Sequence, residues 1–529
     1  MPRVLHRMIE EAASGRPEAL AVSCDGATLS YAELARRANG LARVLVATGV
    51  ARADRVAVWL AKGPRVPVAF YGVFSAGAAL VPIDPKSPAE QVIRILRSTG
   101  ATHLVTEPER HGAVAGLLAA CPGIAQVIGL DGDDQWPRPA IPWSAVLEEA
   151  ADRPPDVAVT EGDAAYILHT SGSTGVPKLI AHTHSTAMSF VEWAVSEYAV
   201  TADDRLTNHS SHHTCFATFD FYVAARAAAT TLILTPSVLM MPGSLAALLE
   251  RERATVWYSV PAALVQLSLR GDLESRDLTS LRWVLFAGET FPGKHLRRLR
   301  QQLPSARFSH VYGSTEVNVC TFYHLPQEGD LPVPLPIGRP CSTAKALVVD
   351  DSLREVPAGA VGELYVGGST VMTGYWDDAA RNGEVLVRRP AGMGADETYF
   401  RTGDRARLLP DGNLTFVARA DRQVKIRGHR VELEEVEAAL LSLTSVEEAA
   451  VFTVPDGEGS QSLCAAVVVG DDERPTERDI LADLRRVLPP HALPTTLTLL
   501  AAMPRTPTGK VDLRALAGSE AATKARDDE

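Results

Sequence analysis

A loop rich in glycine and hydroxyl side chains follows a short apolar stretch near residue 165. After AAYIL, 164–168, the chain continues to Thr170-Ser171-Gly172-Ser173-Thr174-Gly175-Val176-Pro177-Lys178. Glycines let backbone N–H groups converge on phosphate oxygens, the hydroxyl groups add donors, and Lys178 adds a positive charge. The GxxxxGK[ST] spacing of a Walker A loop is absent. Taken alone, such a loop is more often a plain turn than a phosphate site, so the surrounding residues decide its meaning.

Composition argues against several classes of protein. The 529 residues carry a formal net charge of −12, whereas a nucleic-acid-binding protein needs a basic surface, so we expect no nucleic-acid partner. The six cysteines are scattered without a CxxC pair and indicate neither a disulfide framework nor a zinc site. The N-terminus has no apolar signal core, and no apolar run approaches the roughly 20 residues of a membrane span. We therefore expect a cytoplasmic protein without a membrane partner.

The elements that must position the loop are strands alternating with helices. Leu34, Ala38, Leu41 and Leu45 recur at helical spacing and predict a helix over 31–47. Ser30, followed three residues later by Glu33, matches the capping box at a helix start. Short apolar stretches such as RVAVWL and WVLFAG predict buried strands between helices. This alternation predicts an α/β fold with layers of helices and largely parallel sheets.

The pattern changes near residue 360 to short strands joined by Gly and Asp turns. Beyond Gly428 it predicts a helix over 433–443, two strands and a helix over 479–488, which together form a small α+β unit. We place the domain boundary at Ala420–Asp421. The expected organisation is a large N-terminal domain over 1–420, a small C-terminal domain over 421–517 and a disordered polar tail over 518–529.

Ten segments resemble, in order along the chain, the motifs of the adenylate-forming superfamily. They are LSYAEL (29–34), AGAALVPIDP (76–85), the loop at 170–178, FDFY (219–222), VYGSTEV (311–317), GELYVGG with TGYW (362–376), YFRTGD (399–404), ARADRQVKIRGHRVELEEVE (418–437), LPPHALP (488–494) and PTGKVDLRAL (507–516). The superfamily contains acyl-CoA synthetases, luciferases and the adenylation domains of nonribosomal peptide synthetases. The resemblance covers nearly the whole chain and implies their fold, in which the C-terminal domain is a mobile lid.

The resemblance implies ATP and Mg²⁺ as cofactors. Attack of a carboxylate on the α-phosphate brings two anions together, so catalysis depends on charge neutralisation and positioning. Lys510 matches the catalytic lysine that bridges the two anions, and Glu316 matches the magnesium ligand, a hard oxygen donor. Asp404 would accept hydrogen bonds from the ribose hydroxyls with help from Arg419. The remaining ATP-binding residues that are implied are Thr170, Ser171, Gly172, Ser173, Thr174, Gly175, Lys178, Gly288, Glu289, Tyr312 (stacked on adenine), Gly313, Ser314 and Thr315.

Asp421 matches the hinge of the family. There the small domain rotates after adenylation, which withdraws Lys510 and brings the RGHR loop, 427–430, toward a thiol tunnel. A single residue that absorbs a large dihedral change is a known hinge device.

Asp220 of the FDFY motif indicates the class of substrate. In amino-acid-activating relatives this aspartate pairs with the substrate ammonium, and a buried carboxylate needs such a cation. The alternative is a helix-start aspartate that backbone N–H groups satisfy. The rest of the implied substrate pocket is Phe221, Ala224, Tyr258, Leu285, Ala287, Val311, Val319 and Cys320. These side chains bring no second charge, so we expect an amino acid with an uncharged side chain.

The size of the pocket leaves the exact amino acid open. Bulky Phe221 and Tyr258 suggest a short pocket, similar to those of free-standing prolyl-adenylating enzymes and of β-amino acid ligases from macrolactam pathways. We favour a β-amino acid such as 3-aminobutanoate because Phe221 is large. No carrier domain follows Leu516. The expected acceptor is therefore the phosphopantetheine thiol of a separate carrier protein in natural-product (antibiotic) biosynthesis.

Two other functions remain open at this point. An acyl-CoA synthetase would activate a non-amino acid and use coenzyme A as acceptor, and Asp220 argues against it. A catalytically inactive binding protein is disfavoured because Lys178, Glu316, Asp404, Arg419 and Lys510 are all present. The pair His212-His213 lacks the downstream Asp-Gly of a condensation motif, and we expect it in the core or the pocket lining.

Overall fold

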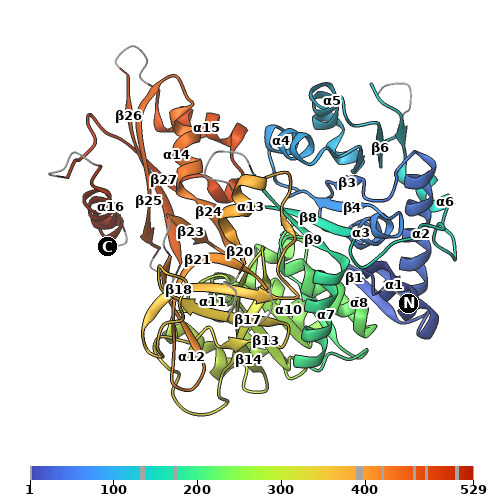
Figure 1. The fold of residues 1–529 in the computed structure, drawn as a ribbon, viewed down its shortest axis with the longest axis horizontal. Helices are drawn as coiled ribbons and strands as arrows, with labels where there is room; N and C mark the ends of the chain where they lie inside the picture. The colour runs from blue at the N-terminus through green and yellow to red at the C-terminus, as the bar shows by residue number, and fades with distance from the viewer. Residues whose placement is uncertain are drawn as a thin grey trace.

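The computed structural model describes residues 3–131, 137–170, 177–388, 397–419, 422–456, 460–470, 475–506 and 511–527. Figure 1 shows a large body, coloured blue to yellow, and a smaller C-terminal group of elements, orange to red, at its upper left. Strands alternate with helices through the first half, which confirms the predicted α/β fold. Among the helices of the described residues, none combines the length and the apolar surface that crossing a bilayer requires.

The largest sheet has nine strands. In spatial order they are β16 (Arg339–Pro340), β15 (Asn318–His324), β14 (Arg307–Ser314), β13 (Trp283–Phe286), β12 (Val256–Ser259), β10 (Arg205–Asn208), β11 (Thr230–Ile233), β1 (Leu20–Cys24) and β2 (Ala27–Ser30). The strands from β14 to β1 run parallel. Their carboxyl ends therefore meet at one edge, which is where open α/β sheets bind ligands.

A second sheet of eight strands carries the segment that leads into the glycine-rich loop. In spatial order it consists of β19 (Gly374–Tyr375), β9 (Lys178–Thr183), β8 (Ala164–Thr170), β4 (Ala79–Pro82), β3 (Arg55–Val58), β5 (His103–Val105), β6 (Gln126–Ile128) and β7 (Ala140–Ile141). Strands β8 and β9 are antiparallel, and Thr170 pairs with Lys178. The two ends of the loop are therefore held side by side.

Helices pack on these two sheets. They are α1 (Leu5–Gly15), α2 (Tyr31–Ala47), α3 (Arg65–Ser75), α4 (Ala89–Thr99), α5 (His111–Ala120), α6 (Trp143–Glu148), α7 (His184–Glu197), α8 (Ala224–Ala227), α9 (Pro236–Leu239), α10 (Pro242–Arg251), α11 (Pro261–Arg270) and α12 (Gly293–Gln302). Helix α2 has the predicted bounds and capping box, because Ser30 Oγ accepts from the backbone N–H of Glu33 and the Glu33 carboxylate accepts from that of Ser30. A core rich in aromatic side chains, including Phe70, Phe190 and Phe219, lies between helices and sheets.

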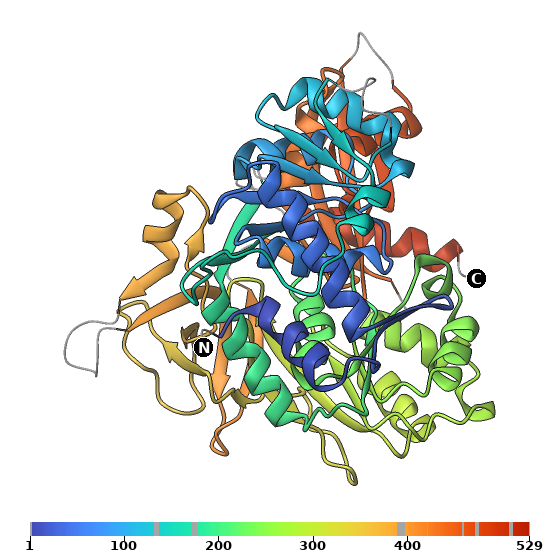
Figure 2. The same ribbon diagram turned by 90° about the vertical axis from the view of Figure 1, so that its right-hand side faces the viewer.

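A third, antiparallel sheet follows near the predicted change of pattern. Its strands are β17 (Ala344–Val349), β18 (Val361–Gly368), β20 (Leu386–Arg388), β21 (Thr398–Leu408) and β22 (Leu414–Arg419), with helix α13 (Ala379–Val385) beside it. In the side view of Figure 2 its yellow-to-orange strands stand on the opposite side from the green helices. The end of β21 and the end of β22 bring Asp404 opposite Arg419.

The small domain begins with a two-stranded hairpin. Its elements are β23 (Gln423–Ile426), β24 (His429–Glu432), α14 (Leu433–Leu441), β25 (Val446–Pro455), β26 (Gln461–Val469), α15 (Glu477–Val487), β27 (Thr496–Leu499) and α16 (Leu513–Asp527). Helices α14 and α15 and the hairpin share one core on the β25–β26 sheet, while Met503 and Leu516 pack on its other face. The boundary residues 420 and 421 lie outside the described residues. We propose the division into 1–420 and 421–517.

The structure corrects the prediction of a disordered tail. Helix α16 runs over Leu513–Asp527, so 518–527 continues a helix instead of forming a disordered segment. The sequence SEAATKA is rich in alanine, the residue with the highest helix propensity, and this preference outweighs the polar composition on which the prediction rested.

Gly40 in α2 offers a test of the packing. A Cβ at this position would lie 2.7 Å from the carbonyl oxygen of Val146, a backbone atom that cannot move alone. We expect Gly40→Ala to lower the free energy of unfolding by about 1–3 kcal/mol. Gly116→Ala in α5 is the matched control, because the added Cβ meets no atom within 4 Å, and it should raise stability by about 0.4–1 kcal/mol. Urea unfolding followed by circular dichroism measures both, and effects of the same sign would contradict the packing described.

Candidate active site

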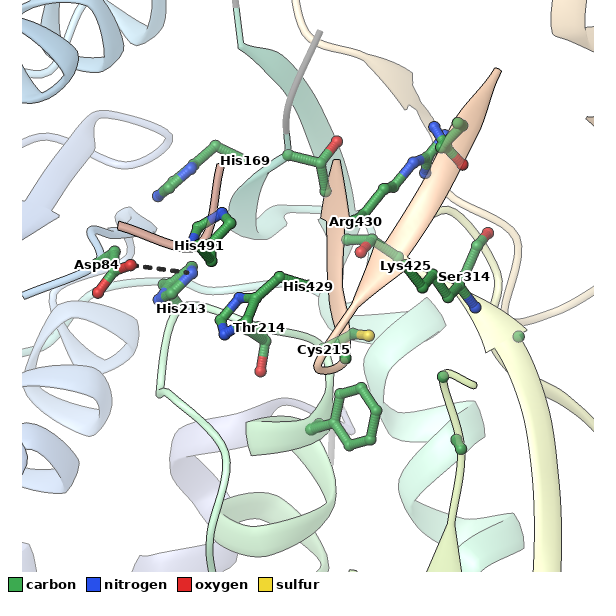
Figure 3. Close-up of a pocket in the computed structure, with 18 of the residues that line it drawn as sticks. Asp84, His169, His213, Thr214, Cys215, Ser314, Lys425, His429, Arg430 and His491 are labelled. Carbon is green, nitrogen blue, oxygen red and sulfur yellow. Dashed lines mark ion pairs between the residues drawn. The ribbon is translucent and has the colours of Figure 1, made fainter. Parts of the chain in front are cut away.

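A pocket lies where the hairpin β23–β24 meets the carboxyl ends of the parallel strands. The large domain contributes Thr170 from β8, Tyr258 from β12, the Ala287–Gly288 segment after β13 and the end of β14. The small domain contributes Lys425, Gly428, His429 and Arg430 of the hairpin region, together with His491. Figure 3 shows Arg430, Lys425 and Ser314 on one side of this pocket and a group of histidines with Asp84 on the other. The site is therefore built by both domains.

Seven of the ten predicted ATP-binding residues that the structure describes line this pocket. Those that line the pocket are Thr170, Gly288, Gly313, Ser314, Thr315, Asp404 and Arg419. Arg419 Nη1 lies 2.6 Å from Asp404 Oδ1, and the Tyr312 hydroxyl donates to the other oxygen of that carboxylate. Gly313 admits no side chain, since a Cβ would lie 1.6 Å from the carbonyl oxygen of Asn318. Residues 171–176, Asp421 and Lys510 lie outside the described residues.

Two further predicted residues sit beside the pocket and are bound by the small domain. Lys178 forms an ion pair with Glu432 of β24. Glu289 accepts a 2.6 Å hydrogen bond from the backbone N–H of Gly428. The hairpin thus binds Lys178 and Glu289, two residues that the sequence assigns to ATP.

Glu316 is completely buried and pairs with a cation from the hairpin. Its Oε1 accepts from Arg430 Nη1 at 2.6 Å and from the Tyr375 hydroxyl at 2.9 Å. Burial alone would raise the pKa of Glu316, but Arg430 outweighs it and holds the pKa at about 2. Oε2 has no hydrogen-bond partner among the described residues. A buried carboxylate that binds one cation and keeps a free oxygen fits a hard divalent ion such as Mg²⁺.

The predicted substrate residues divide into two groups. Tyr258, Ala287 and Val319 line the pocket, and Phe216, which the sequence reasoning missed, lies against Tyr258 with ring centroids 4.7 Å apart. The others are buried and do not line it: Asp220, Phe221, Ala224, Leu285, Val311 and Cys320. Phe221 packs edge-on against Phe70 in the core.

Asp220 is a buried carboxylate that keeps one oxygen free. Oδ2 accepts a 2.9 Å hydrogen bond from Asn208 Nδ2, while Oδ1 has no partner among the described residues. Burial raises the pKa of Asp220 to about 8, against the opposing influence of Asn208 and Lys62. Burial also lowers the pKa of Lys62 to about 7. A cationic ligand at Oδ1 would favour ionised Asp220.

Several site residues had no role assigned from the sequence. Lys62 donates to three successive backbone carbonyls, of Asn208, His209 and Ser210, at 2.7–3.0 Å, and so fixes the loop beside Asp220. Asp84 and His491 line the pocket from within the motifs AGAALVPIDP and LPPHALP, which gave them no individual role. His169 also lines it, next to the glycine-rich loop. The expectation for His212-His213 is confirmed, because His213 lines the pocket and His212 is buried.

Comparisons with known proteins agree with this geometry. Residues 9–376 match the model of the family described as AMP-binding enzyme, and residues 435–510 match the AMP-binding enzyme C-terminal domain. An L-proline–[L-prolyl-carrier protein] ligase of Pseudomonas fluorescens is 33% identical over 97% of this chain and 99% of its own length. One of Streptomyces coelicolor is 36% identical over 92% of this chain and 91% of its own length.

A solved structure extends the similarity to the three-dimensional fold. The amide bond synthetase McbA of Marinactinospora thermotolerans aligns with a TM-score of 0.85 and 26% identity, covering 98% of this chain and 99% of McbA. Together with the family match over most of the chain, this confirms the predicted adenylate-forming fold. The chain belongs to the family of AMP-binding enzymes and is an ATP-dependent, adenylate-forming ligase.

Proposed function

We propose that this enzyme activates a small amino acid with an uncharged side chain as its aminoacyl-AMP. It then transfers the aminoacyl group to the phosphopantetheine thiol of a separate carrier protein in natural-product biosynthesis. The proposal is supported by the two relatives named as ligases of proline and a carrier protein. Within the site, the observation that carries it is the free, buried Oδ1 of Asp220, because a substrate ammonium would give this carboxylate its missing cation.

The proposed roles follow from the charges in the pocket. Asp404, oriented by Arg419, would accept hydrogen bonds from the ribose. Lys178 and the loop 170–175 would hold the phosphates. Glu316 would hold Mg²⁺, whose positive charge offsets that of the phosphate oxygens. By resemblance, Lys510 would bridge the substrate carboxylate and the α-phosphate, and Asp421 would be the hinge of the small domain.

The side chain of the substrate is the finer part of the proposal. Tyr258 and Phe216 close the pocket with aromatic rings, which favours a short substrate. We propose a β-amino acid such as 3-aminobutanoate, because the resemblance assigns the large Phe221 to the substrate pocket. Proline is the second candidate, because both ligases reported above are named for it.

A substrate panel tests the activity directly. We expect pyrophosphate release with a β-amino acid or with proline, and none above background with short fatty acids, since these lack the ammonium that Asp220 requires. The panel contains proline, other α-amino acids, β-alanine, 3-aminobutanoate, larger β-amino acids and short fatty acids. Release confined to proline would discard the β-amino acid, whereas release with fatty acids alone would contradict the role of Asp220.

Replacement of Asp220 separates amine recognition from catalysis. Asp220→Asn keeps the size of the side chain but removes its charge, so kcat/KM for the amino acid should fall about 100-fold or more. The matched comparison is the hydroxy acid of the same carbon skeleton, which has no ammonium to lose. The wild type should activate this hydroxy acid slowly, and the variant should activate it at nearly the same rate. Equal losses for both substrates, measured by pyrophosphate release, would argue for a purely structural Asp220.

Replacement of Arg430 tests whether Arg430 and Mg²⁺ compete for the carboxylate of Glu316. Arg430→Gln removes the cation that pairs with Glu316, so Mg²⁺ should bind that carboxylate more readily. We expect the Mg²⁺ concentration for half-maximal adenylate formation to fall several-fold. Arg427→Gln is the control, because Arg427 is an exposed arginine of the same hairpin turn. An Mg²⁺ dependence unchanged in Arg430→Gln would contradict a shared site.

A further inference from the structure

Four histidines and one aspartate gather on one side of the pocket (Figure 3). His169, the last residue but one of β8, stacks on His213, with ring centroids 5.2 Å apart and planes 8° from parallel. His429 of β24 stacks on His491 in the same way, at 4.1 Å and 9°. His213 Nε2 lies 3.9 Å from an oxygen of Asp84. The large domain thus supplies one stacked pair and the carboxylate, and the small domain supplies the other pair.

The cluster exists because the hairpin occupies the pocket. A Cβ on Gly428 would lie 2.3 Å from a methyl group of Val260, so the hairpin tip rests directly on the large domain. The same tip lies close to Gly288. Gly288 follows Ala287, which we assign to the substrate pocket. His429, the residue after Gly428, lines the same pocket as Ala287.

The imidazoles of the small domain are available as bases. Neither ring nitrogen of His429 or of His491 is hydrogen-bonded to another described residue, although both rings line the pocket. Burial lowers the pKa of His429 to about 4, with His213 adding to this effect, Asp84 opposing it and Lys86 reinforcing it. Burial and the neighbouring His429 lower the pKa of His491 as well. Both imidazoles are therefore neutral at pH 7.

We propose that His429, stacked on His491, is the general base that accepts the proton of the acceptor thiol during aminoacyl transfer. This inference rests on the proposed function, which supplies the aminoacyl-AMP and the thiol. The thiol S–H bond breaks and its proton passes to a nitrogen of His429. The sulfur–carbon bond forms, the bond from the acyl carbon to the phosphate oxygen breaks, and AMP leaves with that electron pair. The Asp84 carboxylate offsets the charge of the imidazolium.

Because the base belongs to the small domain, the position of that domain determines when the thiol can be deprotonated. In this structure His429 and His491 line the pocket while the hairpin binds Glu316 and Lys178. Those are the groups proposed to hold the metal and the phosphates in the first step. Thiol activation is therefore restricted to the orientation in which adenylate formation is blocked.

Single-turnover transfer tests the proposal. Aminoacyl-AMP is formed on the enzyme, quantified by hydroxylamine trapping, and mixed with N-acetylcysteamine, an ordinary alkyl thiol, or with the more acidic trifluoroethanethiol. For His429→Phe, which keeps an aromatic ring but has no nitrogen, we expect transfer to the alkyl thiol to slow about 100-fold per adenylate formed. Transfer to the acidic thiol, largely ionised at pH 8, should stay within a few-fold of the wild type. Arg486→Gln, on the exposed surface of α15, serves as the control.

The dependence on thiol and pH separates a base from a packing residue. Equal slowing with both thiols, in His429→Phe and in His429→Gln, would overturn the proposal. The wild-type transfer rate should stay level down to about pH 5, because the pKa of His429 is lowered, whereas the rate of the variant should fall about tenfold per pH unit as thiolate is lost. A pH dependence in the variant identical to that of the wild type would also overturn it. Absence of any trapped adenylate in the wild type would instead refute the proposed function and this inference with it.

Discussion

The buried carboxylate of Glu316 is the constraint on which the site depends. A carboxylate with no exposure to water must pair with a cation, and in this structure the cation is Arg430 of the small domain. Removing one partner of such a pair costs about 3–5 kcal/mol. Glu316 can satisfy this requirement with Arg430 or with a metal ion, but the position that Arg430 occupies cannot hold both. The residue thus links the position of the small domain to the contents of the pocket.

The other contacts of the hairpin also pair polar groups of the large domain with groups of the small domain. Glu432 neutralises Lys178, and Glu289 accepts from the backbone of Gly428. Lys178, Glu289 and Glu316, which we assign to phosphate, adenine and metal, are therefore each bound by the small domain while the hairpin is present. On the other side of the pocket the hairpin completes the histidine cluster. Movement of the hairpin out of the pocket would release Lys178, Glu289 and Glu316. The same movement would separate the histidines of the small domain from those of the large domain.

The sequence predicts those parts of the molecule that depend on local patterns. Helix α2 and its capping box follow from spacing alone, and Asp404, Arg419 and Gly313 meet in the pocket as their motifs imply. The sequence does not predict contacts between segments distant in the chain, such as that of Asp84 with His213, or a lysine like Lys62 that is bound by backbone carbonyls. The resemblance assigns Phe221 to the substrate pocket, and its edge-on contact with Phe70 could not be predicted from its motif, because motif position does not determine side-chain direction.

A distance measurement between the two domains tests the central claim that Arg430 and a metal compete for Glu316. Spin labels at Ala115 on α5 and Arg486 on α15, both exposed, would report the position of the small domain relative to the large one. In this structure α15 contacts α4 through a 2.8 Å hydrogen bond from Arg94 to the carbonyl oxygen of Val487. Addition of ATP and Mg²⁺ should shift the distance distribution away from that of the ligand-free enzyme. An unchanged distribution with both ligands bound would contradict the account.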